Sequence, residues 1–185
     1  KTQLFQMTLH LSLFPLPPLF QGVYYFTVDQ WDGYRSERAE ILTALAGVQN
    51  LVALTGDIHA FYAGEVHVDF DNPGADPVAV EYVTAGISSS PAQEITQNVV
   101  DNNEALKAYG LADLVPQFDS ILTSSSPHYK YARSMAHGIS VIDVTAPEIT
   151  VTFLEIADVK TKDWDGTVTK TTFKTTSGSN RVTAV

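Results

Sequence analysis

The most informative part of this sequence runs from residue 51 to residue 61 and reads Leu-Val-Ala-Leu-Thr-Gly-Asp-Ile-His-Ala-Phe. A short apolar run with the length of a buried strand ends at Gly56, which is a turn signal. Asp57 and His59 follow, with one apolar residue between them. Alternate residues of an extended chain share a face, so this spacing predicts that both side chains point the same way from the strand end.

Asp57 and His59 are therefore candidate metal ligands. Carboxylate and imidazole groups both bind zinc, iron and manganese well. Ligand crevices in open α/β sheets lie just outside the carboxyl ends of the strands, where this pair falls. The same residues also fit a plain alternative, in which a Gly-Asp turn is followed by a half-buried histidine ring. The motif by itself leaves both interpretations open.

Composition restricts the class of protein. The 185 residues suffice for one domain or for part of a larger one. With 44% hydrophobic and 17% charged residues, the chain has the composition of a soluble globular protein. Eleven basic against 21 acidic residues give a net charge of −10, so we expect no nucleic-acid binding. The absence of cysteine excludes disulfides and thiolate metal sites within this segment.

The N-terminal part raises the question of a membrane span. Residues 11–26 are apolar, but Pro15, Pro17 and Pro18 interrupt the run and it is short. We expect no transmembrane helix and no signal peptide, and we expect residues 11–24 to be the least regular part before the tail.

The remaining pattern predicts a mixed α/β chain. A helix is expected at 35–46, with Ser36 as its N-cap, and a largely helical excursion at 92–123. A turn at 145–148 predicts a hairpin. The expected strands are 23–28, 51–55, 63–70, 78–84, 139–144, 149–155 and, more weakly, 167–175.

Several segments also occur in the order found in a known family. They are Asp29-Gln-Trp-Asp-Gly-Tyr34 with Arg38, Leu54-Thr-Gly-Asp-Ile-His59, Glu81-Tyr-Val-Thr84 with Ser88-Ser-Ser-Pro91, Pro127-His-Tyr-Lys-Tyr131, and His137-Gly138 with Val141-Ile-Asp-Val-Thr145. Together they span most of residues 29–155 and resemble the C-terminal half of the PhoD-like phosphatases, which are relatives of the calcineurin-like metallophosphatases.

This resemblance implies an α/β fold, namely the C-terminal half of a calcineurin-like two-layer β-sandwich flanked by helices. Residues 1–28 would then be an irregular, divergent segment, 29–158 the C-terminal half of the phosphatase domain, and 159–185 a β extension and tail. The family's other metal ligands belong to a half that precedes Lys1. A missing N-terminal half or a second chain is therefore the expected partner.

The implied activity is metal-dependent hydrolysis of phosphate monoesters or diesters by a metal-activated water. By resemblance, Asp57 and His59 are metal ligands, while Trp31 and Asp32 border the substrate cleft. Iron together with calcium is the implied metal content, with zinc or manganese as other choices, and the implied location is periplasmic or extracellular. The alternative is a non-catalytic fragment with a structural or interaction role, because the upstream ligands are absent.

The remaining histidines differ in their expected roles. His128 and His137 lie in segments that resemble loops near the family's active site, so they are candidates for hydrogen bonds to the transition state. His67, between two valines on an expected strand, is interpreted as solvent-facing, and His10 as structural or surface. The serines at 88–90 lack the Gly-x-Ser-x-Gly elbow and are interpreted as a loop rather than as a nucleophile.

Overall fold

The computed structural model describes residues 31–72, 74–157, 159–162 and 165–185. The expected strand at 23–28, the irregular stretch at 11–24 and the N-terminal segment 1–28 lie outside these residues. In chain order the elements are η3 (Trp31–Tyr34), α2 (Arg35–Leu45), β1 (Val52–Thr55), β2 (Phe61–Val66), β3 (Ala79–Val83), α3 (Ala92–Asp101), α4 (Glu104–Ala108), η4 (Leu111–Asp113), η5 (Val115–Gln117), α5 (Phe118–Ser125), β4 (Tyr129–Arg133), β5 (His137–Val144), β6 (Glu148–Ile156), β7 (Val168–Thr176) and β8 (Thr183–Ala184).

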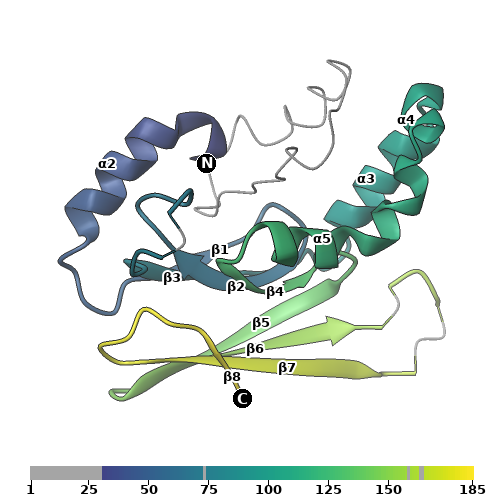
Figure 1. Ribbon diagram of the computed structural model, residues 1–185. Helices are drawn as coiled ribbons and strands as arrows, with labels where there is room; N and C mark the ends of the chain where they lie inside the picture. The colour runs from purple at the N-terminus through teal and green to yellow at the C-terminus, as the bar shows by residue number, and fades with distance from the viewer. Residues whose placement is uncertain (1–30, 73, 158, 163–164) are drawn as a thin grey trace.

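The strands form two four-stranded sheets that stack as layers (Figure 1). Sheet A has the order β1-β3-β2-β4, and sheet B has the order β5-β6-β7-β8. Within sheet A, β1 runs parallel to β3, whereas the pairs β2–β3 and β2–β4 are antiparallel. Helices α2 and α5 lie over the face of sheet A that points away from sheet B, and α3 and α4 extend past one end of the sheets (Figure 1). The expected two-layer sandwich flanked by helices is thus confirmed.

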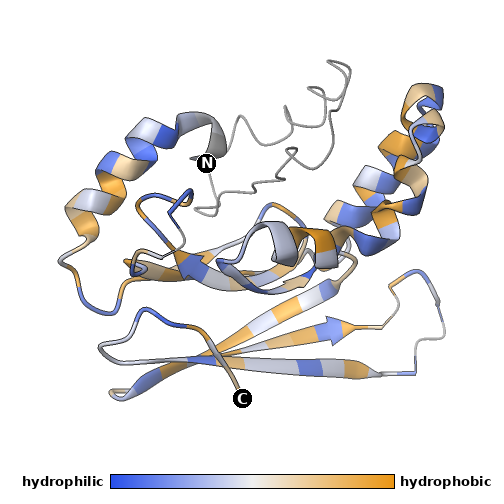
Figure 2. Ribbon diagram, in the orientation of Figure 1, coloured by the Kyte–Doolittle hydropathy of each residue, from blue (hydrophilic) through white to orange (hydrophobic). Residues whose placement is uncertain are grey.

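The core has its centre in β2 and β3, which are buried at every position. Toward sheet B, the rings of Phe61 and Phe153 stack with their centroids 4.7 Å apart. Toward the helices, Leu42 of α2 and Leu122 of α5 are each 1% exposed and pack in one cluster with Tyr62. Burial of each such side chain contributes about 1.5–3 kcal/mol, so the two faces of sheet A dominate the stability of the fold. Figure 2 shows bands of apolar and polar residues along the strands of sheet B.

The strand expected at 51–55 forms, but the expectation that it is buried is wrong. Among the described strands, β1 lies at the border of sheet A, and the side chain of Leu54 is 52% exposed. Val52 packs into the cluster between the sheets, and Leu51 packs into the cluster under the helices. An apolar run can therefore reflect partial packing on both sides of a border strand as well as central burial.

Helix α2 confirms the expected helix at 35–46 but begins differently. Its N-cap is Tyr34, which makes no side-chain capping bond, so the assignment of Ser36 as N-cap is wrong. The turn η3 runs directly into α2, and this continuous helical path removes the extended residue that a serine cap requires.

The C-terminal strands follow the sequence pattern closely. The hairpin expected around residues 145–148 joins β5 to β6, and the Thr145 N–H donates to the Glu148 carbonyl at 2.9 Å. β7 pairs along the length of β6, and β8 adds to β7, so this part of the chain belongs to sheet B. The domain boundaries at 28 and 158 remain predictions. Within the described ranges, no helix is both long and apolar enough to cross a bilayer.

Gly138 lies where β5 comes very close to the backbone of β6. Its φ is +154°, and a Cβ placed there would lie 1.9 Å from the Leu154 carbonyl oxygen and 3.1 Å from the Phe61 ring. The first atom is backbone of the neighbouring strand, so it cannot move aside without breaking the β5–β6 ladder. Only glycine fits this position.

We expect Gly138→Ala to lower the free energy of unfolding by about 1–3 kcal/mol, because overpacking displaces β5 from β6. The matched control is Gly47→Ala, since a Cβ at Gly47 meets nothing within 4 Å and its φ lies outside the left-handed region. The control is expected to change stability by less than about 1 kcal/mol. Urea-induced unfolding measures both, and equal effects would contradict the steric argument.

Candidate metal centre

The turn between β1 and β2 carries the Gly-Asp-Ile-His motif. Asp57 has φ +73° and His59 has φ +57°, so both residues adopt the left-handed conformation. Residues other than glycine rarely do so, and each instance costs about 1–3 kcal/mol. The extended geometry expected for this pair is therefore wrong, because the direction of both side chains is set by a tight turn and not by strand alternation.

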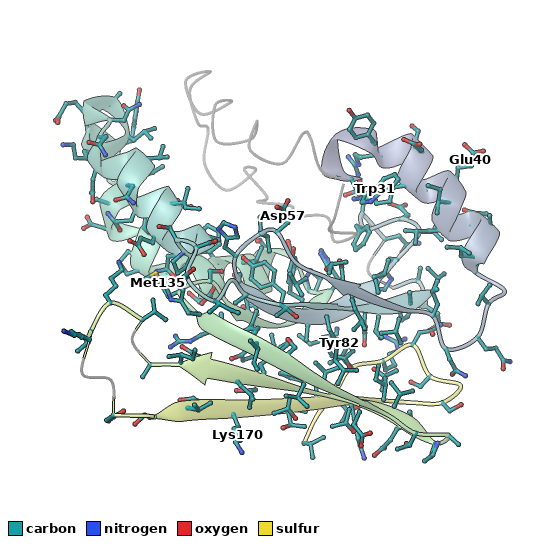
Figure 3. The ribbon with its side chains drawn as sticks, turned by 180° about the vertical axis from the view of Figure 1, so that it is seen from behind. Trp31, Glu40, Asp57, Tyr82, Met135 and Lys170 are labelled. Atoms are coloured by element: carbon teal, nitrogen blue, oxygen red, sulfur yellow. The ribbon has the colours of Figure 1, made fainter. Side chains whose placement is uncertain are left out.

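Asp57 is exposed at this turn. Figure 3 shows it at the end of sheet A, on the side of the molecule where the helices lie and away from sheet B. An exposed carboxylate beyond a strand end is accessible to a cation.

The ring of His59 is held by the loop that precedes α3. Its Nδ1 atom lies 2.8 Å from the carbonyl oxygen of Ser90. A carbonyl oxygen only accepts, so Nδ1 carries a proton, and in the neutral imidazole Nε2 is then the nitrogen with the lone pair. The Ala92 N–H donates to the His59 carbonyl at 3.1 Å, which makes a second bond between the same two segments. The imidazole is therefore oriented with its acceptor nitrogen directed away from the loop.

Glu81 is a residue of this region that the sequence reasoning did not single out for a role. It is fully buried in β3 and accepts a hydrogen bond from the Thr55 hydroxyl at 2.6 Å. Thr55 is the last residue of β1, so this bond fixes the strand end immediately before the turn. The signal in the sequence was an acidic residue in the middle of the apolar run at 78–84.

Two histidines were expected near the substrate. Of these, His137 is the one on the same side of the molecule as the turn between β1 and β2. It begins β5, and the N–H of the next residue, Gly138, donates to the Gly86 carbonyl at 3.1 Å. Gly86 belongs to the same loop as Ser90, so the structure brings His137 toward the segment that holds His59. His137 itself is 9% exposed.

His128 lies at the other end of sheet A. Its carbonyl accepts from the Glu65 N–H at 2.9 Å, and Glu65 is near the end of β2, whereas His59 lies just before the strand begins. This separation is on the order of 20 Å along the strand. The structure therefore does not bring His128 together with Asp57 and His59.

Trp31 begins η3, and the short helix runs into α2 on the helical side of sheet A (Figure 3). The side chain of Asp32 is outside what the structure describes. The role of both residues at a substrate cleft remains a prediction.

A second polar cluster surrounds His128. The buried carboxylate of Glu65 accepts from Arg181 at 3.1 Å and lies 3.3 Å from the Lys130 ammonium. The ring of Phe70 contacts both His128 and His67, with centroid distances of 4.6 and 5.9 Å. These groups border a cavity of about 80 Å³.

His67 is 4% exposed, so its expected solvent-facing position is wrong. Its Nδ1 atom is buried without a hydrogen-bond partner within the described residues. β2 is buried on both faces and ends at Val66, and the His67 ring just beyond it packs against Phe70, so strand alternation does not place His67 in solvent.

Burial lowers the pKa of His67 below its ordinary value of 6.5, partly offset by the nearby Glu65 carboxylate. The unfolded chain therefore takes up this proton more readily than the folded one, and the stabilising contribution is complete above about pH 6.5 and is lost as pH falls below it. We expect the unfolding free energy of the wild type to fall more steeply between about pH 8 and pH 5 than that of His67→Gln. Parallel pH profiles in urea denaturation would contradict this.

Among the described residues, no group of three or more His, Cys, Asp and Glu side chains converges to hold a metal ion. Asp57 and His59 nevertheless fit a partial site, since one is an exposed carboxylate and the other an imidazole with its Nε2 lone pair available. The turn can supply two ligands of a larger set.

The fold and this turn define a mixed α/β sandwich with metal-ligand residue types at a strand end. A family model described as PhoD-like phosphatase matches residues 6–153. The chain therefore belongs to the PhoD-like phosphatase family, as its sequence motifs indicated.

Two relatives give the extent of the likeness. Alkaline phosphatase D of Bacillus subtilis (strain 168) is 35% identical over 66 residues, which are 35% of this chain and 11% of that protein. A solved structure titled "Structure of PhoD" superposes with a TM-score of 0.60 at 20% identity, over 85% of this chain and 26% of that one. The structural likeness establishes the fold. The chain spans only about a quarter of that solved structure, and the match to the curated relative covers about a tenth of its length.

Proposed function

We propose that this chain is part of a metal-dependent phosphoesterase that hydrolyses phosphate monoesters or diesters. The observation that carries the proposal is the strained turn in a chain of the PhoD-like family. Asp57 and His59 both hold a left-handed backbone that costs free energy. Such strain persists where it presents side chains for a task, and here those side chains are a carboxylate and an imidazole.

Asp57 and His59 would hold the metal, and the rest of the set would come from the part of the protein that this chain does not cover. A bound metal supplies positive charge that lowers the pKa of a coordinated water and neutralises phosphate oxygens. Iron with calcium is the proposed content, with zinc or manganese as alternatives.

The chain's other polar residues are proposed to bind the ester. His137 has the better position for a hydrogen bond to the phosphate, because it borders the loop that holds His59. The role of His128 at the phosphate remains a prediction. Its distance from His59 along β2 does not favour that role. Trp31 and Asp32 are proposed to border the cleft.

The expected partner is the remainder of a PhoD-like protein, in the same or another chain. Its proposed docking place is the border of sheet A, where β1 has one described neighbouring strand and Leu54 is 52% exposed. An exported location, periplasmic or extracellular, is proposed for the complete protein.

We expect Asp57→Asn in the complete protein to lower metal content and to reduce hydrolysis of an aryl phosphate by at least about a hundredfold, because the substitution removes a charge that the metal requires. The shape of the side chain is nearly unchanged, so the circular dichroism spectrum is expected to stay the same. Asp143→Asn, an exposed carboxylate on β5, is the matched control and is expected to retain both properties. Full metal content and activity in Asp57→Asn would overturn the ligand assignment.

The second candidate is a non-catalytic fragment with a structural or interaction role. It is favoured by the incomplete ligand set among the described residues. Intact mass and metal analysis of protein purified from its source separate the two functions. A longer polypeptide or a co-purifying second chain with bound metal supports the phosphoesterase, whereas this chain alone without metal supports the fragment.

A further inference from the structure

The loop from Thr84 to Pro91 connects the central strand β3 to α3 and is anchored at both ends. At its start, the Thr84 N–H donates to the Thr55 carbonyl at 2.9 Å, and the Gly86 carbonyl accepts from Gly138 in sheet B at 3.1 Å. At its end, the Gln93 N–H in the first turn of α3 donates to the Ser134 carbonyl at 3.1 Å. The loop is therefore fixed to both sheets and cannot shift independently of them.

The end of this loop makes two hydrogen bonds to His59. The imidazole Nδ1–H donates to the Ser90 carbonyl at 2.8 Å, and the Ala92 N–H donates to the His59 carbonyl at 3.1 Å. The two bonds enclose Pro91, which is buried. One of them orients the ring and the other holds the strained backbone of the same residue.

Pro91 determines where the Ser90 carbonyl points. A residue before proline is restricted to extended conformations, because the proline ring clashes with the α conformation of its neighbour. Pro91 itself is the N-cap of α3 with φ −62° and ψ 155°. The Ser90 carbonyl is thus held in place before His59 contacts it, and the serine side chain has no part in the bond.

We propose that the Ser90–Pro91 peptide is a positioning element for the metal centre, which fixes His59 in the Nδ1–H tautomer and presents Nε2 to the metal. The proposal rests on the function proposed above. It gives the Ser-Ser-Ser-Pro segment a role through its backbone carbonyl and its proline, with no serine acting as a nucleophile. A hydrogen bond from the second ring nitrogen of a ligating histidine commonly fixes both tautomer and orientation.

The test uses the complete protein without metal, labelled with ¹⁵N-histidine, at about pH 8.5, where an ordinary imidazole is neutral. Long-range ¹H–¹⁵N spectra assign which ring nitrogen of His59 carries the proton. We expect Nδ1–H in the wild type and in Ser90→Ala, which keeps the carbonyl and the proline. We expect a mixture of tautomers in Pro91→Gly, because glycine releases the conformation of Ser90.

Calorimetric titration with Mn²⁺ alone gives the second readout. Pro91→Gly is expected to bind about 10–100-fold more weakly than the wild type, and Ser90→Ala to bind equally well. If Pro91→Gly fails to fold by circular dichroism, Pro91→Ala replaces it. The wild-type spectrum is unaffected by this change and still tests the Nδ1–H tautomer. A wild-type Nε2–H tautomer, or a change in Ser90→Ala as large as that in Pro91→Gly, would overturn the proposal.

The two proposals fail differently. If the wild type shows Nδ1–H but binds no Mn²⁺, the metal function fails while the tautomer assignment holds. If Asp57→Asn abolishes Mn²⁺ binding but Pro91→Gly leaves affinity and tautomer unchanged, the metal function holds and the positioning role is wrong.

Discussion

Sheet A is buried on both faces, and this burial holds its central strands in place. β2 and β3 have no exposed position, because sheet B covers one face and helices α2 and α5 cover the other. Close packing of this kind leaves the strands no room to shift. Gly138 shows how little space the packing leaves, since a single methyl group there would overlap the backbone of β6. The strand ends are consequently fixed points from which loops can be positioned.

The strained turn after β1 depends on the fixed strand ends of sheet A. A left-handed aspartate and a left-handed histidine separated by one residue would relax if the turn were free. The part-buried Thr55–Glu81 bond secures the strand end before the turn, and the segment at Ser90–Ala92 secures His59 after it. This arrangement holds the backbone of the exposed Asp57 and orients the imidazole of His59, two residues later.

The polar residues at the far end of β2 serve a different purpose. The buried carboxylate of Glu65 forms ion pairs with Lys130 of β4 and Arg181 of the C-terminal segment. Glu65 is buried, but the side chains of Lys130 and Arg181 are 36% and 53% exposed, so solvent weakens each ion pair relative to a fully buried one. The cluster therefore ties the end of the chain to sheet A and keeps the two layers in register, at a distance from the proposed metal centre.

The α/β class, most strand and helix positions and the β5–β6 hairpin could be predicted from the sequence, because periodicity and turn residues act locally. The family could be predicted from the order of its motifs. The sequence also singled out Asp57 and His59 by residue type. Four features follow only from the fold: β1 borders sheet A among the described strands, His67 is buried, His128 lies far from His59, and Ser90 supplies a carbonyl to the imidazole. These features depend on which segments meet in space, and the direction of the two candidate ligands depends on backbone angles that alternation along a strand does not describe.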